Sequence, residues 1–292
     1  MNETRVIFKG YLTIVGGDMP GIEAVQNMMG HGSYHGCRWC KNPGILMPGG
    51  TKVYFPLVKP KDMIPSNVDT SNWNDVTPRE CCEGLRRDKT SILQACEQIT
   101  EARKESKAAA ERVQRSTGLY IFVKNSVNMQ DIIGIKGFSE LYRLPTIDPA
   151  NSFALDVMHM AFLNIFPNIF DHWRGTFFTG RSNDQNSLII SENNHRAIGV
   201  EMGAHRNCIP TDMGRTVRDH YKKKTGFKSE ENARFYMLFN FLFEDYVPEA
   251  LLAPFCTFAA TIQKSVESTS LTQLEIEEIE KDCWDFYDHY ER

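Results

Sequence analysis

Two cysteines, Cys37 and Cys40, are separated by two residues in the glycine-rich stretch 30–50, which has no helical period. Two thiolates at this spacing can reach one zinc ion, and an irregular loop gains order from such a clip. Structural zinc needs four ligands, and His31 and His35 are the nearest residues that could complete the set. The alternative is a pair of unmetallated thiols. A thioredoxin-type redox motif is less favoured, because the pair does not open a helix after a core strand.

Asp18 follows the segment 5–15, which is rich in β-branched and aromatic residues and is predicted to form one or two strands. A carboxylate at the end of a strand lies at the edge of a sheet, where loops open toward a ligand. A hard divalent cation needs such oxygen ligands. The alternative is a turn-forming aspartate, which is common before proline and glycine.

Asp156 and His159 are three residues apart on a predicted helix whose other face is apolar. Side chains at this spacing are neighbours on a helix, so they can hydrogen-bond each other or share a polar partner. The alternative is a histidine at the edge of the core that is satisfied by its neighbouring aspartate.

A group of basic residues lies between positions 206 and 228. Phosphate backbones attract such groups, and the resulting affinity falls steeply with salt. The alternative is a solvated loop. The residues are Arg206, Arg215, Arg218, Lys222, Lys223, Lys224 and Lys228.

The composition limits the class of protein. The chain has 292 residues, 41% of them hydrophobic and 24% charged, with a formal net charge of −4. This usage excludes disorder as the main state, and no apolar run reaches the roughly 18–20 residues that cross a bilayer. The first ten residues do not resemble a signal peptide, and eight cysteines are too few for a disulfide scaffold. We therefore expect a reducing, intracellular compartment.

Most of the elements that must position these residues are predicted to be helices. Pro167 should kink one of them or start a second helix. The polar helix beginning at Thr77 has charges of alternating sign and is expected to be solvated. The predicted helices cover residues 21–29, 77–115, 155–173, 188–202, 229–243, 248–264 and 272–290.

Taken in order, these blocks resemble transposases of the CACTA (En/Spm) superfamily, in particular the fungal form. The resemblance is carried by Gly-Asp-Met-Pro at 17–20, by Gly-His-x-x-x-x-Gly-Cys-x-x-Cys at 30–40 and by Asp-Val-Met-His at 156–159. It covers most of the chain and is loose between about 60 and 140. It implies a DDE enzyme with an α/β ribonuclease-H-like core, in which three carboxylates hold two Mg²⁺ or Mn²⁺ ions for strand cleavage and transfer.

By this likeness Asp18 is a metal-binding catalytic acid, Asp156 and His159 match a DxxH motif near the active site, and Cys37 and Cys40 are half of a zinc site. The family's first acid and its third acid have no matching block in this sequence. The resemblance therefore implies a central fragment that is inactive alone. DNA would be the partner of the intact enzyme, in the nucleus, with a homo-oligomer as a further expectation.

The expected organisation is a partial ribonuclease-H-like core with the CxxC loop at 1–60, a helical and loop connector at 61–150 and a helical insertion at 151–292. Missing strands should leave an exposed apolar edge near residues 5–15. Two other functions stay open: a domesticated, non-catalytic DNA-binding module, and a zinc-stabilised interaction module.

Overall fold

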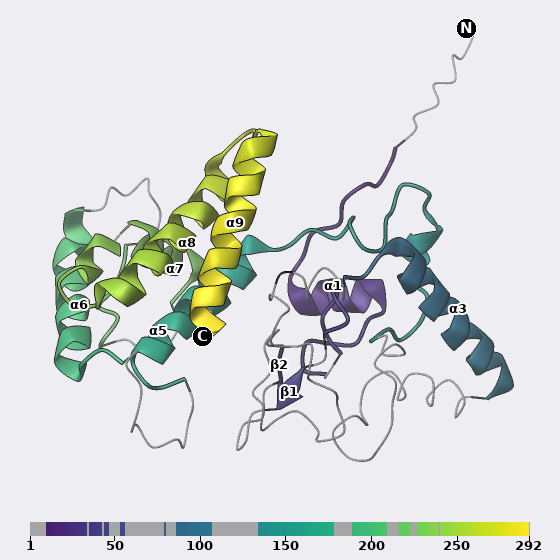
Figure 1. The fold of residues 1–292 in the computed structure, drawn as a ribbon, viewed down its shortest axis with the longest axis horizontal. Helices are drawn as coiled ribbons and strands as arrows, with labels where there is room; N and C mark the ends of the chain where they lie inside the picture. The colour runs from purple at the N-terminus through teal and green to yellow at the C-terminus, as the bar shows by residue number, and fades with distance from the viewer. Residues whose placement is uncertain are drawn as a thin grey trace, which may run out of the picture. The chain divides into compact units, whose positions relative to one another are not determined.

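The computed structural model describes residues 10–33, 35–42, 44–46, 53–55, 79, 86–106, 134–177, 189–208, 216–222, 227–238 and 240–291. The chain divides into two compact units, Met1–Asp156 and Val157–Arg292. The helices and strands of each unit are labelled in Figure 1.

The described elements of the first unit are few and short. They are α1 (Met19–Gln26), β1 (Ile45–Leu46), β2 (Val53–Tyr54), α3 (Lys89–Glu105) and a 3₁₀ helix (Glu140–Arg143). A capping box starts α3, because the Asp88 carboxylate accepts from Ser91 N at 2.8 Å while Ser91 Oγ accepts from Asp88 N at 3.2 Å.

Helix α3 has one buried face and is not the solvated helix expected here. Its apolar residues recur at three- and four-residue steps, and Met28 and Ile135 pack against them. The start of this helix expected at Thr77 lies outside the described residues. The buried residues of α3 are Ile92, Ala95, Cys96, Ile99 and Ala102.

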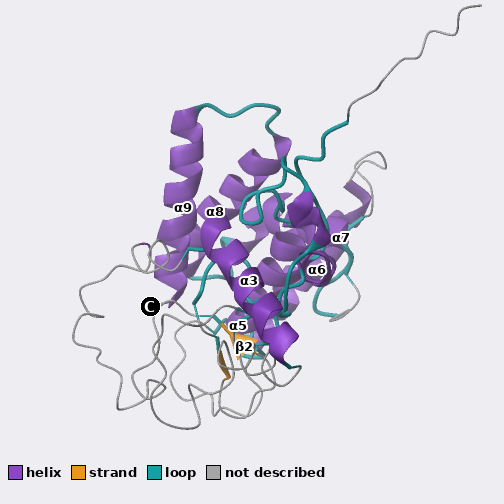
Figure 2. Cartoon of the chain, turned by 90° about the vertical axis from the view of Figure 1, so that its right-hand side faces the viewer, coloured by secondary structure: helices purple, strands orange, loops and turns teal. Residues whose placement is uncertain are grey.

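The predicted α/β ribonuclease-H-like core is wrong. The strands of the described residues form one antiparallel pair, with Ile45 opposite Tyr54 and Leu46 opposite Val53, and the other regular elements of the described residues are helices (Figure 2). A segment with high β-propensity becomes a strand of a sheet only where a neighbouring segment supplies a hydrogen-bonded ladder. In the described residues 10–15 that ladder is a single bridge from Val15 to Phe153.

Residues 11–14 expose large apolar side chains beside that bridge. Tyr11, Leu12 and Ile14 are 69%, 43% and 66% exposed. The described part of the expected apolar edge is therefore an exposed extended segment and not the edge of a large sheet.

The regular elements among the described residues of the second unit are all helices. Its α-helices are α5 (Phe166–Trp173), α6 (Glu192–His205), α7 (Ser229–Ala233), α8 (Glu249–Glu267) and α9 (Gln273–Glu291). A π-helical segment, Met158–Ile165, leads directly into α5, and a second one, Arg234–Leu238, directly follows α7. Two 3₁₀ helices span Arg206–Cys208 and Asn240–Phe243. Pro167 lies in the first turn of α5, directly after the point where the π-helical turns pass into an α-helix.

Aromatic side chains dominate the core of the second unit. Phe166 stacks on Tyr236 with ring centroids 5.3 Å apart, and Phe170 meets Phe235 edge-on at 5.3 Å. Aromatic pairs of this kind add to the free energy gained by burying their area. This core holds the helices of the second unit together.

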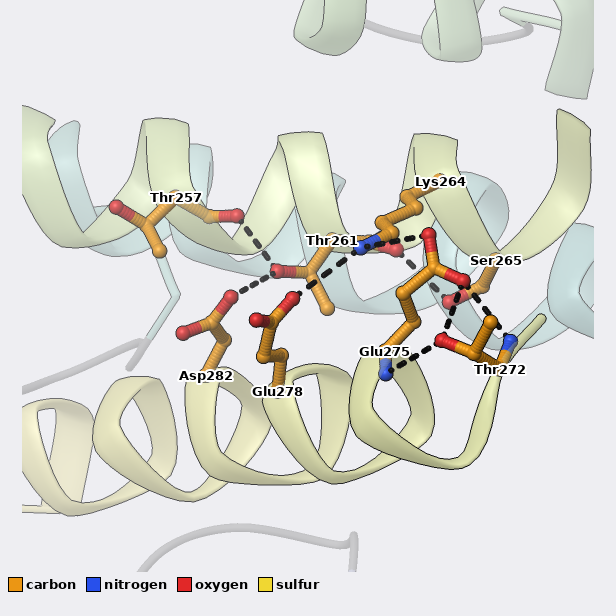
Figure 3. A network of polar contacts seen from close by, with 8 residues as sticks. All are labelled: Thr257, Thr261, Lys264, Ser265, Thr272, Glu275, Glu278 and Asp282. Carbon is orange, nitrogen blue, oxygen red and sulfur yellow. Dashed lines mark hydrogen bonds and ion pairs between the residues drawn. The ribbon is translucent and has the colours of Figure 1, made fainter. Parts of the chain in front are cut away.

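Helices α8 and α9 pack against each other as a hairpin joined by residues 268–272 (Figure 1). The Thr272 hydroxyl accepts from Glu275 N, and the Glu275 carboxylate accepts from Thr272 N, which caps α9. Lys264 Nζ of α8 lies 3.5 Å from Glu275 and 3.4 Å from Glu278 (Figure 3).

Candidate functional site

Two extended segments of the first unit run side by side and in the same direction. Val15 N donates to Ser152 O at 2.8 Å, and Ala154 N donates to Val15 O at 2.9 Å, so Val15 and Phe153 form a parallel bridge. Asp18 and Asp156 each follow a bridged residue by three positions. The single bridge thus joins the two segments three positions before each of two aspartates that are far apart in the sequence.

Asp18 is the N-cap of α1. Its Oδ1 accepts a hydrogen bond of 2.9 Å from Gly21 N, and the residue is exposed. A Cβ at position 21 would lie 2.6 Å from that oxygen, so glycine allows the close approach. The predicted position at the edge of a ribonuclease-H-like sheet is wrong, because Asp18 ends an extended segment and starts a helix.

Asp156 directly precedes a helical run, and His159 lies in the first turn of that run. Asp156 is half-buried and precedes the helical segment, whereas His159 is half-buried within the π-helical turns Met158–Ile165. Asp156 is the last residue of the first unit, and His159 belongs to the second. A π-helical segment at this position is notable, because such segments are frequent at functional sites.

Cys37 and Cys40 lie together in an irregular loop. Cys40 Sγ donates to Cys37 Sγ at 3.3 Å. The pKa of Cys37 is lowered to about 6, and this hydrogen bond is the main cause. Burial opposes the shift. Hydrogen bonds with the backbone of Cys40 and Trp39 and the charge of Arg87 lower the pKa further. The pair therefore contains one thiol that ionises readily near neutral pH.

Arg87 closes this loop from a distant part of the sequence. Its Nε donates to Cys37 O at 3.0 Å and to Cys40 O at 3.1 Å, and its backbone N donates to Trp39 O. The side chain is buried, and burial lowers its pKa while the charges of Cys37 and Cys40 raise it. Arg87 thus fixes both ends of the CxxC turn.

Arg38 connects the CxxC loop to the segment that leads to Asp156. Its Nη2 donates to Ala154 O at 2.9 Å, and its guanidinium carbon lies 4.0 Å from the ring centroid of Trp39. The residue is 3% exposed, and its Nε and Nη1 have no hydrogen-bond partner among the described residues. Burial lowers the pKa of Arg38, and the charges of Glu23 and Cys37 raise it.

His31 and His35 differ in their exposure to solvent. The exposed His31 donates from its backbone N to Glu23 Oε1 at 2.8 Å, and His35 is buried. No group of three or more histidine, cysteine, aspartate or glutamate side chains that could hold a metal occurs within the described residues. Cys81 and Cys82 lie outside them. Zinc at Cys37 and Cys40 and magnesium or manganese at Asp18 stay predictions.

The basic group is described in part. Arg215, Lys223 and Lys224 lie outside the described residues, and Arg206, Lys222 and Lys228 are exposed. Lys222 pairs with Asp219 at 3.1 Å, and Arg206 Nε donates to Thr216 Oγ1 at 3.2 Å. These contacts keep two of the cations close to polar groups of the same unit.

Arg218 has a structural role that the sequence did not suggest. Its Nε lies 2.5 Å from Glu231 Oε1 and its Nη2 lies 2.8 Å from Glu231 Oε2, a two-pronged pair with a buried carboxylate. Glu231 also accepts from Lys228 N at 3.0 Å, which holds the start of α7. The hydrogen bonds that Arg218 donates to Glu231, together with the charge of this carboxylate, raise the pKa of Arg218.

Comparison of the chain with family models, with curated proteins and with solved structures gives no match. Among the described helices, none combines the length and the apolar character that spanning a membrane requires. The site must therefore be interpreted from its own geometry.

Proposed function

We propose that this chain carries part of a DNA strand-transfer enzyme, a transposase similar to those of the CACTA superfamily, and that Asp18 and Asp156 bind a divalent cation. The observation that supports the proposal is that hydrogen bonds within the first unit link α1, the 30–40 block and the segment that leads to Asp156. Glu23 of α1, the helix that Asp18 caps, accepts from His31, and Arg38 donates to Ala154 O, two residues before Asp156.

The donor set suits a hard cation. Asp18 is exposed and uses Oδ1 as a helix cap, and carboxylate oxygens are the ligands that Mg²⁺ and Mn²⁺ prefer. When bound, such an ion activates water or a 3′-hydroxyl group and stabilises the leaving oxygen. Asp18 and Asp156 would hold the ion. Because two-metal catalysis in this class uses three acids, and the first and third have no matching block in the sequence, we expect the chain alone to bind the cation without cleaving DNA.

Titration of the full chain with Mn²⁺, followed by electron paramagnetic resonance, tests the cation site. We expect Asp18→Asn and Asp156→Asn each to raise the Kd by about tenfold or more, the equivalent of roughly 1.4 kcal/mol. Asparagine caps helices about as well as aspartate, so Asp18→Asn removes the charge and keeps the cap. Glu97→Gln, an exposed change on α3, is the matched control. Equal Kd values in all four proteins would refute the cation site.

A second experiment separates catalysis from DNA binding. Labelled duplex DNA is incubated with the chain and Mg²⁺ or Mn²⁺, and strand cleavage and retention are measured at low and high salt. We expect salt-sensitive retention that the triple variant Lys222→Glu, Lys223→Glu, Lys224→Glu weakens, and no cleavage. Cleavage would contradict the expected inactivity. Retention by a chain that fails the Mn²⁺ test would favour a non-catalytic DNA-binding module.

A further inference from the structure

We propose that Cys37 and Cys40 are a reversible dithiol–disulfide pair, in which Cys37 attacks an external disulfide and Cys40 resolves the mixed disulfide. The two Sγ atoms are 3.3 Å apart in one loop. A disulfide bond is about 2 Å long, so little more than a side-chain rotation brings the sulfurs together. This chemistry is independent of the function proposed above.

The two thiols differ in a way that assigns their roles. Cys37 is partly exposed, whereas Cys40 is 7% exposed and donates its thiol hydrogen to Cys37 Sγ. An external reagent therefore reaches Cys37 first. Cys40 is already in contact with the sulfur that it must attack, which makes the second step intramolecular.

Two buried arginines favour this reaction. Arg87 hydrogen-bonds the carbonyl oxygens of Cys37 and Cys40, so the ends of the turn are held by the backbone whether the sulfurs are bonded or not. Arg38, between the two cysteines, donates from Nη2 to Ala154 O at 2.9 Å and so anchors the middle of the turn to a distant segment. These contacts hold the loop in the shape that keeps the two sulfur atoms together.

The oxidant is a low-molecular-weight disulfide such as glutathione disulfide. The Cys37 thiolate attacks one of its sulfurs, a mixed disulfide forms and one glutathione thiolate leaves. Cys40 loses its proton and attacks Cys37 Sγ, which forms the Cys37–Cys40 bond and releases the second glutathione. The protein loses two electrons and two protons, and the external disulfide becomes two thiols. A thiol reductant reverses both steps.

Tryptic digestion makes the product easy to identify, because cleavage after Arg38 and Lys41 puts Cys37 on peptide 10–38 and Cys40 on peptide 39–41. The full chain is equilibrated in glutathione redox buffers, quenched with acid and N-ethylmaleimide, digested and analysed by mass spectrometry. We expect the two peptides to be joined, lighter by two hydrogen atoms than their sum. Cys208, which is exposed, serves as an internal control that should carry glutathione instead.

Two variants test the assigned roles. Cys40→Ser should trap Cys37 as a stable glutathione adduct, and Cys37→Ser should leave Cys40 open to N-ethylmaleimide in the denaturing quench. Circular dichroism checks that both variants keep their helices. Failure to join the two peptides, with Cys208 fully modified, would overturn the proposal. So would thiols that become oxidisable only after a chelator removes bound zinc, since zinc would then be the native state of the pair.

Discussion

The guanidinium group of Arg38 donates a 2.9 Å hydrogen bond from Nη2 to the carbonyl oxygen of Ala154, across 116 positions of sequence. This contact ties the CxxC loop to the segment that precedes Asp156. The buried guanidinium group of Arg38 interacts electrostatically with the carboxylate of Glu23, which is only 4% exposed. Buried charges of the first unit thus link α1, the CxxC loop and the segment that leads to Asp156.

Removal of this cation should destabilise the first unit. Arg38→Met leaves the Ala154 carbonyl without its donor and the buried Glu23 carboxylate without the cation, so we expect a loss of about 1–3 kcal/mol in the free energy of unfolding. Urea denaturation measures the loss. Lys104→Met, at an exposed pair with Glu101, is the control and should have little effect. Equal stability of the two variants would contradict the role assigned to Arg38.

Two glycines on α6 give opposite predictions. A Cβ at Gly199 would lie 2.5 Å from Asp219 Oδ1 and 2.9 Å from the backbone N of Tyr221, so Gly199→Ala should lower stability by about 1–3 kcal/mol. At Gly203 the nearest atom is Asp219 Cβ at 3.6 Å, and Gly203→Ala should raise stability by up to about 1 kcal/mol. Thermal unfolding of the two variants should move in opposite directions. A rise for Gly199→Ala would show that α6 is farther from Asp219 and Tyr221.

The Arg218–Glu231 pair should stabilise the second unit. Glu231 is 3% exposed, and Glu231→Gln removes the charge that receives both guanidinium hydrogen bonds. We expect a loss of about 1–3 kcal/mol, measured by urea denaturation. Asp285→Asn breaks the exposed pair with Lys281 on α9 and should change stability far less. If both variants lose the same amount, the pair at Glu231 is no stronger than a surface pair.

The second unit should lose stability in mild acid. Burial is the main cause that lowers the pKa of His220 to about 3, and the charges of His195 and Arg174 lower it further. Below pH 6.5 the unfolded chain takes up a proton at this residue and the folded chain does not. The free energy of unfolding should therefore fall by about 1.4 kcal/mol for each pH unit from 6.5 toward 3.

Replacement of this histidine tests the pH effect. The ring of His220 stacks on Phe235 with centroids 4.8 Å apart, so His220→Phe keeps an aromatic ring in place. Urea denaturation between pH 7.5 and pH 5 should show a shallower decline for His220→Phe than for the unaltered chain. The change His31→Gln, at an exposed position, is the control. Identical slopes in all three proteins would exclude His220 as the cause.

The sequence predicts the second unit better than the first because helices depend on local spacing. Apolar positions at three- and four-residue steps place α8 and α9 within a few residues of their observed bounds. The strands expected at 5–15 depend on partners elsewhere in the chain, which local propensity does not report. The described part of that segment has one bridge, at Val15.

The candidate site is also predicted only in part from the sequence. The CxxC pair is visible as a motif, and Sγ atoms 3.3 Å apart agree with the proximity that its spacing suggests. Arg87 is not visible in this way, because it is adjacent to Arg86 in the sequence and only the fold buries one and exposes the other. Buried charges are set by contacts between distant segments, and a single sequence carries no local sign of them.

The five-residue connection between α8 and α9 has a consequence for how the second unit forms. Contacts between these helices, including those of Lys264 with Glu275 and Glu278, join residues that are close in sequence (Figure 3). Closing so short a loop costs little entropy, and local contacts form quickly. We therefore expect the hairpin to form early in folding, before the aromatic rings of the preceding helices pack against it.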